Sequence, residues 1–527
     1  MRVANIMKNI IKIFLASNIL AFGSVDLTAA DATVSSSGNW SESSTWGGSY
    51  PGSAVDTLNF TQGGLELVVD SNASAKQILL YDDDGYTNNA SIVINQGVSF
   101  NIGGISPAIK GADNPAPSGD NWKTILTFSG AGTLNISLPQ SSYFSYGKYI
   151  FNADVVNDGP TNLSLQLSNA TMDVNGTWNG NQTIDMFANS VLNVNGSMNV
   201  YNVKGWAQCN INVNAGGTLN IQKNPNYSWA TGMYGRIGTV DGSLIVDSGA
   251  ENSERYSLRL GCDDNNRWDG KWTIGSTGTI KVMSYSKYYF QVRNTALTIN
   301  SAAKSLYSNN TILFGGYSAN ASGGSIGDTS VVFNTSNPFT VSSFSQAESS
   351  FAIGLVNASG KKAASSVKFT LNADNSFGEI EFFQANADVA NTLQADSVLT
   401  IAANGHLVNI GKLSLEGADY SELAEDHVYL KLQALTDWTV QLANIETVNT
   451  QLIFEDDSYE VYKTSNIQFS TAEDSDTYLD AYLVKNKLDE NGYYFINTSS
   501  AVPEASTYAA IMGVVALAAS LLRRRRR

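Results

Sequence analysis

The chain repeats one short apolar pattern along much of its length. The pattern is a small residue, then Thr or Ser, an aliphatic residue, any residue, and Val or Ile. Copies occur at residues 132–136, 170–174, 217–221, 242–246 and 278–282, with a looser copy at 190–194 and partial copies at 296–299 and 398–401. Within each copy, apolar and polar residues alternate with the period of two that is typical of a β-strand. Repetition of such strands indicates a repeat architecture.

The spacing of the copies selects among repeat folds. Their central aliphatic residues, at positions 134, 172, 192, 219, 244 and 280, are separated by 38, 20, 27, 25 and 36 residues. Intervals of this size suit the coils of a β-solenoid with loops of variable length. Asn-Gly and Asp-Gly pairs mark turns that suit hairpins equally well. We therefore predict an all-β fold, a right-handed parallel β-helix over residues 61–415, with an array of β-sandwich domains as the alternative.

Cysteine usage offers a test of this prediction. The chain has two cysteines, Cys209 and Cys262. Coils of about 25 residues would place them two coils apart. At about 4.8 Å per coil the separation is near 10 Å, beyond the reach of a disulfide. Both are expected to be free thiols, whereas a hairpin-based fold would allow a bond.

The predicted stack has distinct segments at its two ends. Residues 31–60 carry Trp40 and Trp46 among turn residues, which resembles the opening of bacterial surface proteins with autotransporter-like β-repeats. The resemblance implies a cap over the first coil, which would otherwise expose apolar core and strand edges. Two tryptophans in a loop-rich β domain are the alternative. Residues 416–500 are predicted to form an acidic β module, partly helical at 423–438.

The first 30 residues predict a secretory signal peptide. A basic start is followed by an apolar stretch at residues 13–22 and by small residues that offer cleavage sites near position 30. The stretch is too short, and too soon followed by polar residues, to be a stable membrane span. Met1 and Met7 are equally good starts.

Residues 501–527 predict a tail directed to a membrane. An uncharged apolar run covers residues 507–522, and five arginines follow it: Arg523, Arg524, Arg525, Arg526 and Arg527. As a transmembrane helix the run would span about 24 Å, which is short for a bilayer core of about 30 Å. The arginines cannot cross the membrane and are expected to stay cytoplasmic.

The motif Val502-Pro503-Glu504-Ala505 precedes this helix. Motif, helix and basic cluster together resemble the PEP-CTERM sorting signal of exported Gram-negative bacterial proteins, a tail also labelled the ice-binding-protein C-terminal domain. The resemblance implies recognition of Val502, Pro503 and Glu504 by an exosortase-like membrane transpeptidase. It also implies export to the cell envelope or surface, with at least transient anchoring in the inner membrane. Ala505 replaces the second proline of the motif, which leaves the cleavage site open. An ordinary C-terminal membrane anchor is the alternative.

The charge of the exported part excludes some partners. Without residues 1–30 and 501–527, 23 basic and 45 acidic residues remain, a net charge of about −22. A polyanion of this kind is a poor candidate for binding nucleic acid or anionic membranes, because both require a basic face.

No catalytic set is apparent, and we predict that the protein is not an enzyme. His406 and His427 lack the spacing of a zinc pair and are expected to be structural. No cofactor is predicted, although two acidic runs could supply oxygen ligands to Ca²⁺; solvated turns are the alternative, since neither run has the spacing of a known calcium loop. The calcium candidates are Asp82, Asp83, Asp84, Asp263, Asp264 and Asp269.

The predicted function is that of an exported structural or adhesion protein of the cell surface or extracellular matrix. An extracellular polysaccharide is the partner that such a protein could contact. The alternative is a polysaccharide lyase or glycoside hydrolase, which would use carboxylates and basic residues on one exposed face. The nearest such mixture is Asp247, Asp263, Asp264 and Asp269 with Arg255, Arg259 and Arg267. Aromatic residues that could stack on sugars, or instead fill the core, are Trp206, Trp229, Trp268, Trp272, Tyr288 and Tyr289.

Overall fold

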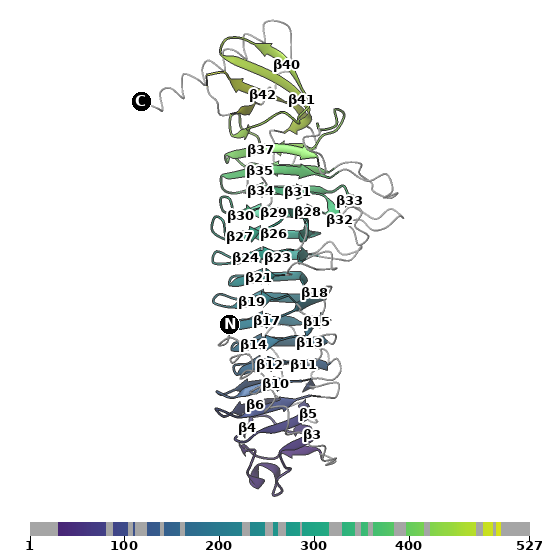
Figure 1. Cartoon of the computed structure of the whole chain (residues 1–527), viewed down its shortest axis with the longest axis vertical. Helices are drawn as coiled ribbons and strands as arrows, with labels where there is room; N and C mark the ends of the chain where they lie inside the picture. The colour runs from purple at the N-terminus through teal and green to yellow at the C-terminus, as the bar shows by residue number, and fades with distance from the viewer. Residues whose placement is uncertain are drawn as a thin grey trace, which may run out of the picture.

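The computed structural model describes residues 30–496 except 81–87, 104–108, 111–123, 138–141, 159–163, 224–231, 248–256, 262–269, 285–286, 316–328, 343–348, 357–361, 384–396, 416–421, 471–477 and 489–491. In this part of the chain the fold is all-β, and most strands pair in parallel in one elongated stack (Figure 1). The prediction of an all-β fold with solenoid-like parallel sheets is confirmed. The alternative array of β-sandwich domains is wrong.

Each coil contributes a strand segment to each of three parallel ladders. Ladder 1 comprises β1 (Ala32–Val34), β3 (Ala54–Phe60), β5 (Ala73–Leu80), β8 (Ile109–Lys110), β11 (Ser142–Phe151), β13 (Ser164–Val174), β15 (Thr183–Phe187), β18 (Asn202–Val213), β20 (Gly232–Val240), β22 (Leu258–Gly261), β25 (Phe290–Arg293), β28 (Ile312–Gly315), β31 (Phe351–Ile353), β35 (Asn375–Phe382) and β37 (Val408–Leu415).

Each of the long strands bends, and its two halves pair in different ladders. The second halves of β11, β13, β18 and β20 belong to ladder 2. Its other strands are β2 (Gly38–Asn39), β4 (Leu65–Val69), β6 (Asn88–Ile94), β9 (Thr124–Ser129), β16 (Val191–Val194), β23 (Gly270–Ile274), β26 (Thr295–Ile299), β29 (Thr329–Phe333), β34 (Ser366–Leu371), β36 (Val398–Ala402) and β38 (Leu430–Gln433).

Ladder 3 completes each coil and includes the first residues of β5, β35 and β37. Its other strands are β7 (Ser99–Ile102), β10 (Thr133–Ile136), β12 (Asp154–Asn157), β14 (Thr177–Gly180), β17 (Ser197–Val200), β19 (Thr218–Ile221), β21 (Ser243–Asp247), β24 (Thr279–Met283), β27 (Leu306–Ser308), β30 (Phe339–Val341) and β39 (Val440–Leu442). A short antiparallel hairpin, β32 (Leu355–Val356) with β33 (Lys362–Ala363), projects from the stack (Figure 1).

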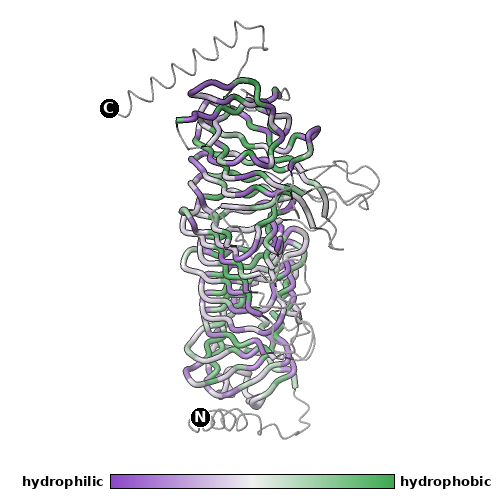
Figure 2. The backbone as a smooth tube through the Cα atoms, turned by 45° about the horizontal axis from the view of Figure 1, so that its top comes forward, coloured by the Kyte–Doolittle hydropathy of each residue, from purple (hydrophilic) through white to green (hydrophobic). Residues whose placement is uncertain are grey.

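Alternation along the strands builds one continuous core. In β16, β17 and β19 every second residue is buried, because successive side chains of a strand point to opposite faces. The buried residues form one main hydrophobic cluster that runs along the stack. Figure 2 shows the matching alternation of apolar and polar segments along the tube. Burial of this apolar surface is the main stabilising term, at about 25 cal/mol per Å².

Stacked asparagines line one corner of the coils. The Nδ2 atom of Asn175 donates to Oδ1 of Asn152 over 2.7 Å, and Asn195 donates in the same way to Asn175 over 2.7 Å. Asn214 donates to Asn195 over 2.6 Å. The parallel register places these residues one above another, so each side chain satisfies its neighbour.

The structure corrects the alignment of the repeated pattern. The central residues Leu134, Leu219, Leu244 and Ile280 lie on ladder 3, whereas Met172 and Leu192 lie on ladder 2. Two strands of one coil therefore carry the same pattern. Mixing them produced the 38- and 27-residue intervals, whereas the 25- and 36-residue intervals separate true neighbours on ladder 3 and reflect loops of different length. On ladder 3 the spacing is regular at the asparagines that stack from β14 to β19, with steps of 20 and 21 residues.

The N-terminal end of the stack is closed by two tryptophans. Trp40 is fully buried, and its ring meets that of Trp46 edge to face, with centroids 5.0 Å apart. The indole Nε1 of Trp40 donates to the carbonyl oxygen of Gly52, and that of Trp46 donates to the carbonyl oxygen of Trp40. The short helix η1 (Ser43–Trp46) holds Trp46 in place. Apolar core in the first coils is thereby covered.

An antiparallel sheet closes the C-terminal end. It contains β40 (Thr450–Glu455), β41 (Tyr459–Phe469), β42 (Leu479–Asn486) and β43 (Tyr493–Ile496). The end of β41 pairs in parallel with β38 and extends ladder 2, and β43 pairs with β39 of ladder 3. The parallel ladders thus continue past residue 415, the predicted limit of the solenoid. The prediction of partial helix at 423–438 is wrong, because this segment contains β38 and turns.

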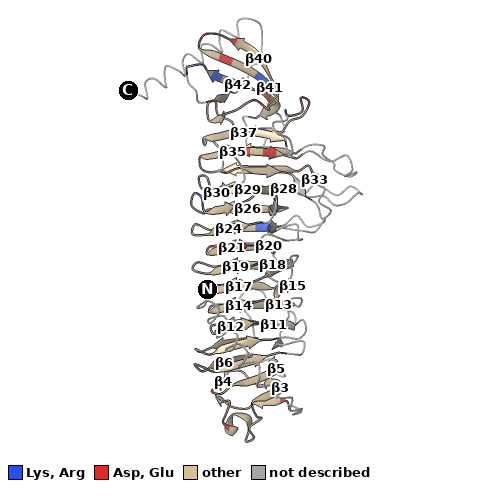
Figure 3. Cartoon of the chain, viewed as in Figure 1, with Lys and Arg blue, Asp and Glu red and all other residues tan. Residues whose placement is uncertain are grey.

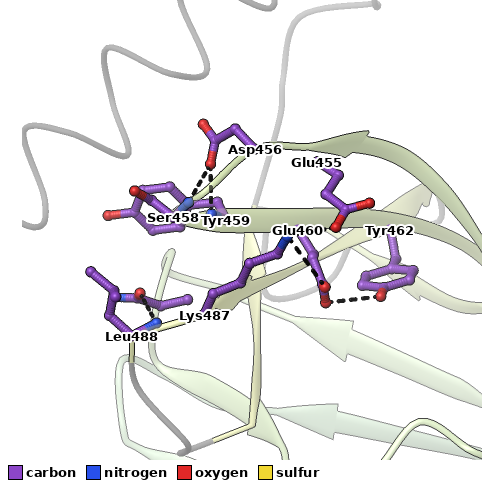
Figure 4. A network of polar contacts seen from close by, with 9 residues as sticks. Glu455, Asp456, Ser458, Tyr459, Glu460, Tyr462, Lys487 and Leu488 are labelled. Carbon is purple, nitrogen blue, oxygen red and sulfur yellow. Dashed lines mark hydrogen bonds and ion pairs between the residues drawn. The ribbon is translucent and has the colours of Figure 1, made fainter.

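Charged side chains are sparse along the stack and more frequent on this sheet (Figure 3). Lys487 Nζ lies 2.5 Å from Glu455 Oε1 and 3.8 Å from Glu460 Oε1 (Figure 4). Tyr462 Oη donates to Glu460 Oε2 over 3.0 Å. Burial, and then this bond, raises the pKa of Tyr462 to about 12. Asp456 accepts hydrogen bonds from two backbone N–H groups in the β40–β41 turn. The contacts tie three adjacent strands together.

No helix in the described part of the chain is long and apolar enough to span a membrane. The transmembrane helix predicted at 507–522 lies outside that part.

We expect Trp178→Ala to destabilise the stack strongly. Trp178 is fully buried, and its ring meets that of Phe151 edge to face at 5.2 Å. Removing so large a core side chain costs about 3–5 kcal/mol. Denaturant unfolding followed by circular dichroism measures the loss. As a control, Tyr50→Ala removes a ring that is 46% exposed and should cost less than about 0.5 kcal/mol. Equal losses would contradict the assignment of the core.

Candidate functional site

Most residues singled out from the sequence lie outside the described part of the chain. This holds for the motif Val502, Pro503 and Glu504 and for Arg523–Arg527. It also holds for the calcium candidates Asp82, Asp83, Asp84, Asp263, Asp264 and Asp269, and for Arg255, Arg267, Trp229, Trp268 and Cys262. Among the described residues, no group of three or more His, Cys, Asp or Glu side chains could hold a metal ion.

The two histidines lie in different surroundings. His406 Nδ1 lies 3.4 Å from Asp374 Oδ1, and its backbone N–H closes a turn onto Ala403. The His427 ring packs edge-on against Tyr429, with centroids 4.5 Å apart. Both positions are consistent with structural contacts.

The remaining predicted site residues are divided among separate parts of the fold. Asp247 ends β21 on ladder 3, whereas Arg259 is a nearly buried residue of β22 on ladder 1. Trp272 is not an exposed aromatic: it is fully buried in the core, and its Nε1 donates to Gly235 O over 2.8 Å. Tyr288 is buried and Tyr289 half-buried, so of the described aromatic candidates Trp206 alone is exposed.

A continuous row of side chains runs up the outer face of ladder 1. Strand register places its members on successive rungs, with their side chains pointing away from the core. The row is Tyr143, Gln166, Asp185, Lys204, Tyr234, Arg259, Gln291, Leu313, Ala352, Glu381 and Ser414. We call it the ladder-1 row. It mixes charged, amide and aromatic groups, in contrast to the asparagine-rich corner.

The C-terminal half of the ladder-1 row is covered. Arg259 Nε donates to Gln291 Oε1 over 2.9 Å, and Gln291 Nε2 donates to Tyr288 O over 3.1 Å. Tyr288 Oη in turn donates to Glu381 Oε2 over 2.9 Å. Burial, reinforced by the charge of Glu381, raises the pKa of Tyr288 well above its usual value. These bonds join rungs that are far apart in the chain.

A second apolar cluster lies on the same outer face. It consists of Tyr288, Leu313, Ala352 and Phe383, and it is separate from the main core. The Tyr288 and Phe383 rings meet edge to face, with centroids 4.8 Å apart. Because outward side chains are buried here, this half of the face packs within the protein.

In the N-terminal half of the ladder-1 row, Tyr143, Gln166, Asp185 and Lys204 are half-buried, and we call this part the open half. It carries an aromatic patch of Phe187, Trp206 and Tyr234, of which Tyr234 is buried. Trp206 is 43% exposed. Its ring is parallel to that of Phe187 within 4°, with centroids 6.5 Å apart. Tyr234 meets Trp206 at 87° and 5.1 Å. Neighbouring rungs thus hold the exposed indole in one orientation.

Asp185 lies beside the aromatic patch and is coupled to it. Burial raises the pKa of Asp185 above its ordinary value. Hydrogen bonds from the Ser164 and Trp206 side chains and the charge of Lys204 oppose that rise. The carboxyl group therefore helps to fix the indole through a hydrogen bond.

This open half has the chemistry of a binding surface. A glycosidase needs two carboxyl groups about 5–9.5 Å apart. The rung neighbours of Asp185 in the ladder-1 row are Gln166 and Lys204, neither of which is a carboxylic acid. An exposed aromatic ring with amide, carboxyl and ammonium groups beside it can bind a ligand by stacking and hydrogen bonding.

Comparisons of the chain with family profiles, with curated proteins and with solved structures give no match.

Sequence reasoning found Trp206 and Arg259 but missed Asp185, Phe187, Lys204 and Tyr234. Alternation alone could show that Asp185 points outward, since it lies between the inward-facing residues Ile184 and Met186. For Lys204 the signal is weaker, because Val203 precedes it but Gly205 follows it. Which of them share a row depends on strand register, and loops of unequal length hide the register.

Cys209 is a free, buried thiol, as predicted. Burial raises the pKa of Cys209 to about 12, so very little thiolate forms near neutral pH. In a Cys262→Ser variant, we expect Cys209 to react with iodoacetamide at pH 8 roughly a hundredfold more slowly than in the urea-unfolded chain, whose thiol pKa is about 8.5. Mass spectrometry follows the modification. Equal rates in both states would contradict the buried position.

Proposed function

We propose that the protein is an exported structural and adhesive rod of the cell surface or extracellular matrix. In this proposal its C-terminal tail carries a PEP-CTERM-like sorting signal. An exosortase-type transpeptidase recognises the tail in the inner membrane of a Gram-negative-type bacterium. The rod is then delivered to the envelope and is not an enzyme.

The placement of β43 is the observation that supports this proposal most directly. β43 is the last described strand, and it pairs with β39 at the end of ladder 3 and with β42 of the closing sheet. Pro503 follows the end of β43 by seven residues. The last described strand therefore lies at the C-terminal tip of the rod, in the sheet that closes the parallel stack (Figure 1).

Attachment of the rod to the membrane by one end suits a protein that acts as a spacer at the cell surface. With the tail at the C-terminal tip, the end closed by Trp40 and Trp46 is the end farthest from the membrane. In the described part of the chain, parallel pairing joins successive coils from one tip to the other, which supports a rod that acts as one unit. The net charge of about −22 on the exported part keeps such a surface soluble.

The sorting step is tested with Pro503→Ala combined with Glu504→Ala. We expect this double variant to stay in the inner membrane with its arginines attached, because the transpeptidase no longer recognises the motif. Cell fractionation gives the location, and the mass of the mature C-terminus shows whether the tail was removed.

The matched control is Ser499→Ala with Ser500→Ala, which changes two small residues just before the motif and should leave sorting unchanged. Surface delivery of the Pro503 and Glu504 double variant at the wild-type level would refute the proposed role of the motif. An intact tail on wild-type protein would indicate an ordinary membrane anchor.

A further inference from the structure

The aromatic patch is an unusual feature of this surface. The other described tryptophans are buried or half-buried, whereas Trp206 exposes 43% of its surface. Leaving a large ring in water forgoes its apolar burial, which favours a role in contact with another molecule. Phe187, Tyr234 and Asp185 all restrain the indole, so little ordering is needed when a ligand binds.

One ammonium group lies beside this patch. Lys204 is half-buried, lies one rung from Asp185 and precedes Trp206 by two residues on β18. The described arginines of the neighbouring rungs, Arg236, Arg259 and Arg293, are nearly buried and do not present their charge at the surface. Lys204 therefore gives the patch a group that can pair with a negative ligand.

The distance between Trp206 and Lys204 indicates which chemical class of ligand could contact both side chains. They are two residues apart on β18, so their side chains leave the same face of the strand about 7 Å apart. A ligand that fits both side chains needs an apolar ring face for the indole and an anionic group about 7 Å away for the ammonium group. A sugar ring that carries a carboxylate has both. A nucleic acid fits less well, because its backbone carries a charge about every 1.7 Å and would be repelled by the rest of this acidic rod.

We propose that the open half of the ladder-1 row, from β13 to β18, binds an acidic polysaccharide. A sugar ring packs on Trp206, and a carboxylate of the glycan pairs with Lys204. Gln166 offers amide groups to sugar hydroxyls one rung from Asp185. Asp185 is a positioning residue that holds the indole through a hydrogen bond.

This inference deepens the adhesive part of the proposed function and rests on it. Binding is measured on the full chain purified in mild detergent, so the outcome does not depend on whether the tail is cleaved. A failure of the sorting test would leave the binding result standing, and the reverse also holds.

The experiment titrates the protein with polygalacturonate and with alginate, and with dextran as an uncharged glycan. Calorimetry at low and at physiological salt gives the affinities. We expect both acidic glycans to bind, with affinity falling as salt screens the charges, and dextran not to bind. Trp206→Ala should weaken binding roughly tenfold, in keeping with the value of an aromatic contact. Lys204→Gln should weaken it and reduce its salt dependence.

Matched variants separate the site from general surface effects. Tyr50→Ala removes a similarly exposed ring near the N-terminal tip, and Lys281→Gln removes an exposed ammonium group on ladder 3. Both should bind acidic glycans like the wild type, and circular dichroism checks that each variant is folded. The proposal is overturned if the wild type binds neither acidic glycan, if dextran binds equally well, or if folded Trp206→Ala keeps full affinity. Tighter binding of single-stranded DNA than of either glycan would also overturn it.

Discussion

Parallel hydrogen bonding between successive coils is the constraint on which the rest of this structure depends. Most strand segments of the three ladders pair with the coil before them and the coil after them, so the backbone of one coil depends on its neighbours for hydrogen bonds. Such a stack is stable in its middle and vulnerable at its ends, where edges and core would be exposed. One end of the stack is covered by Trp40 and Trp46, and the other is covered by the antiparallel sheet β40–β43.

The fold class could be predicted from the sequence because alternation with a period of two reports directly which side chains face the core. The assignment of repeats to strands could not. Met172 and Leu192 were aligned with Leu134 although they lie on a different ladder. Both strands of a coil bury alternate aliphatic residues in the same core, so they acquire the same pattern. Only pairing in space distinguishes them, and the limit of the parallel stack was misplaced for the same reason.

The candidate site was only partly accessible from the sequence. Trp206 and Arg259 stand out as residue types that an acidic β-rich chain uses sparingly. Asp185 and Tyr234 do not stand out, since each occurs in an ordinary strand. They become part of one surface because register stacks β15, β18 and β20, although the connections between these strands differ in length. Residues on adjacent rungs are thus close in space. The number of residues between them varies with loop length, so local sequence patterns do not identify them as neighbours.

The asparagine stack also bears on how such a rod ages chemically. Asn175 and Asn195 each precede a glycine, the pairing most prone to spontaneous deamidation, in which the next backbone nitrogen attacks the side-chain carbonyl carbon. Here the nitrogens of Gly176 and Gly196 donate to Phe151 O and Val174 O at 3.0 and 2.8 Å, and both side-chain amides are held by their neighbours. The attacking atom is turned toward the adjacent coil. Packing between coils therefore protects these two Asn-Gly turns from deamidation.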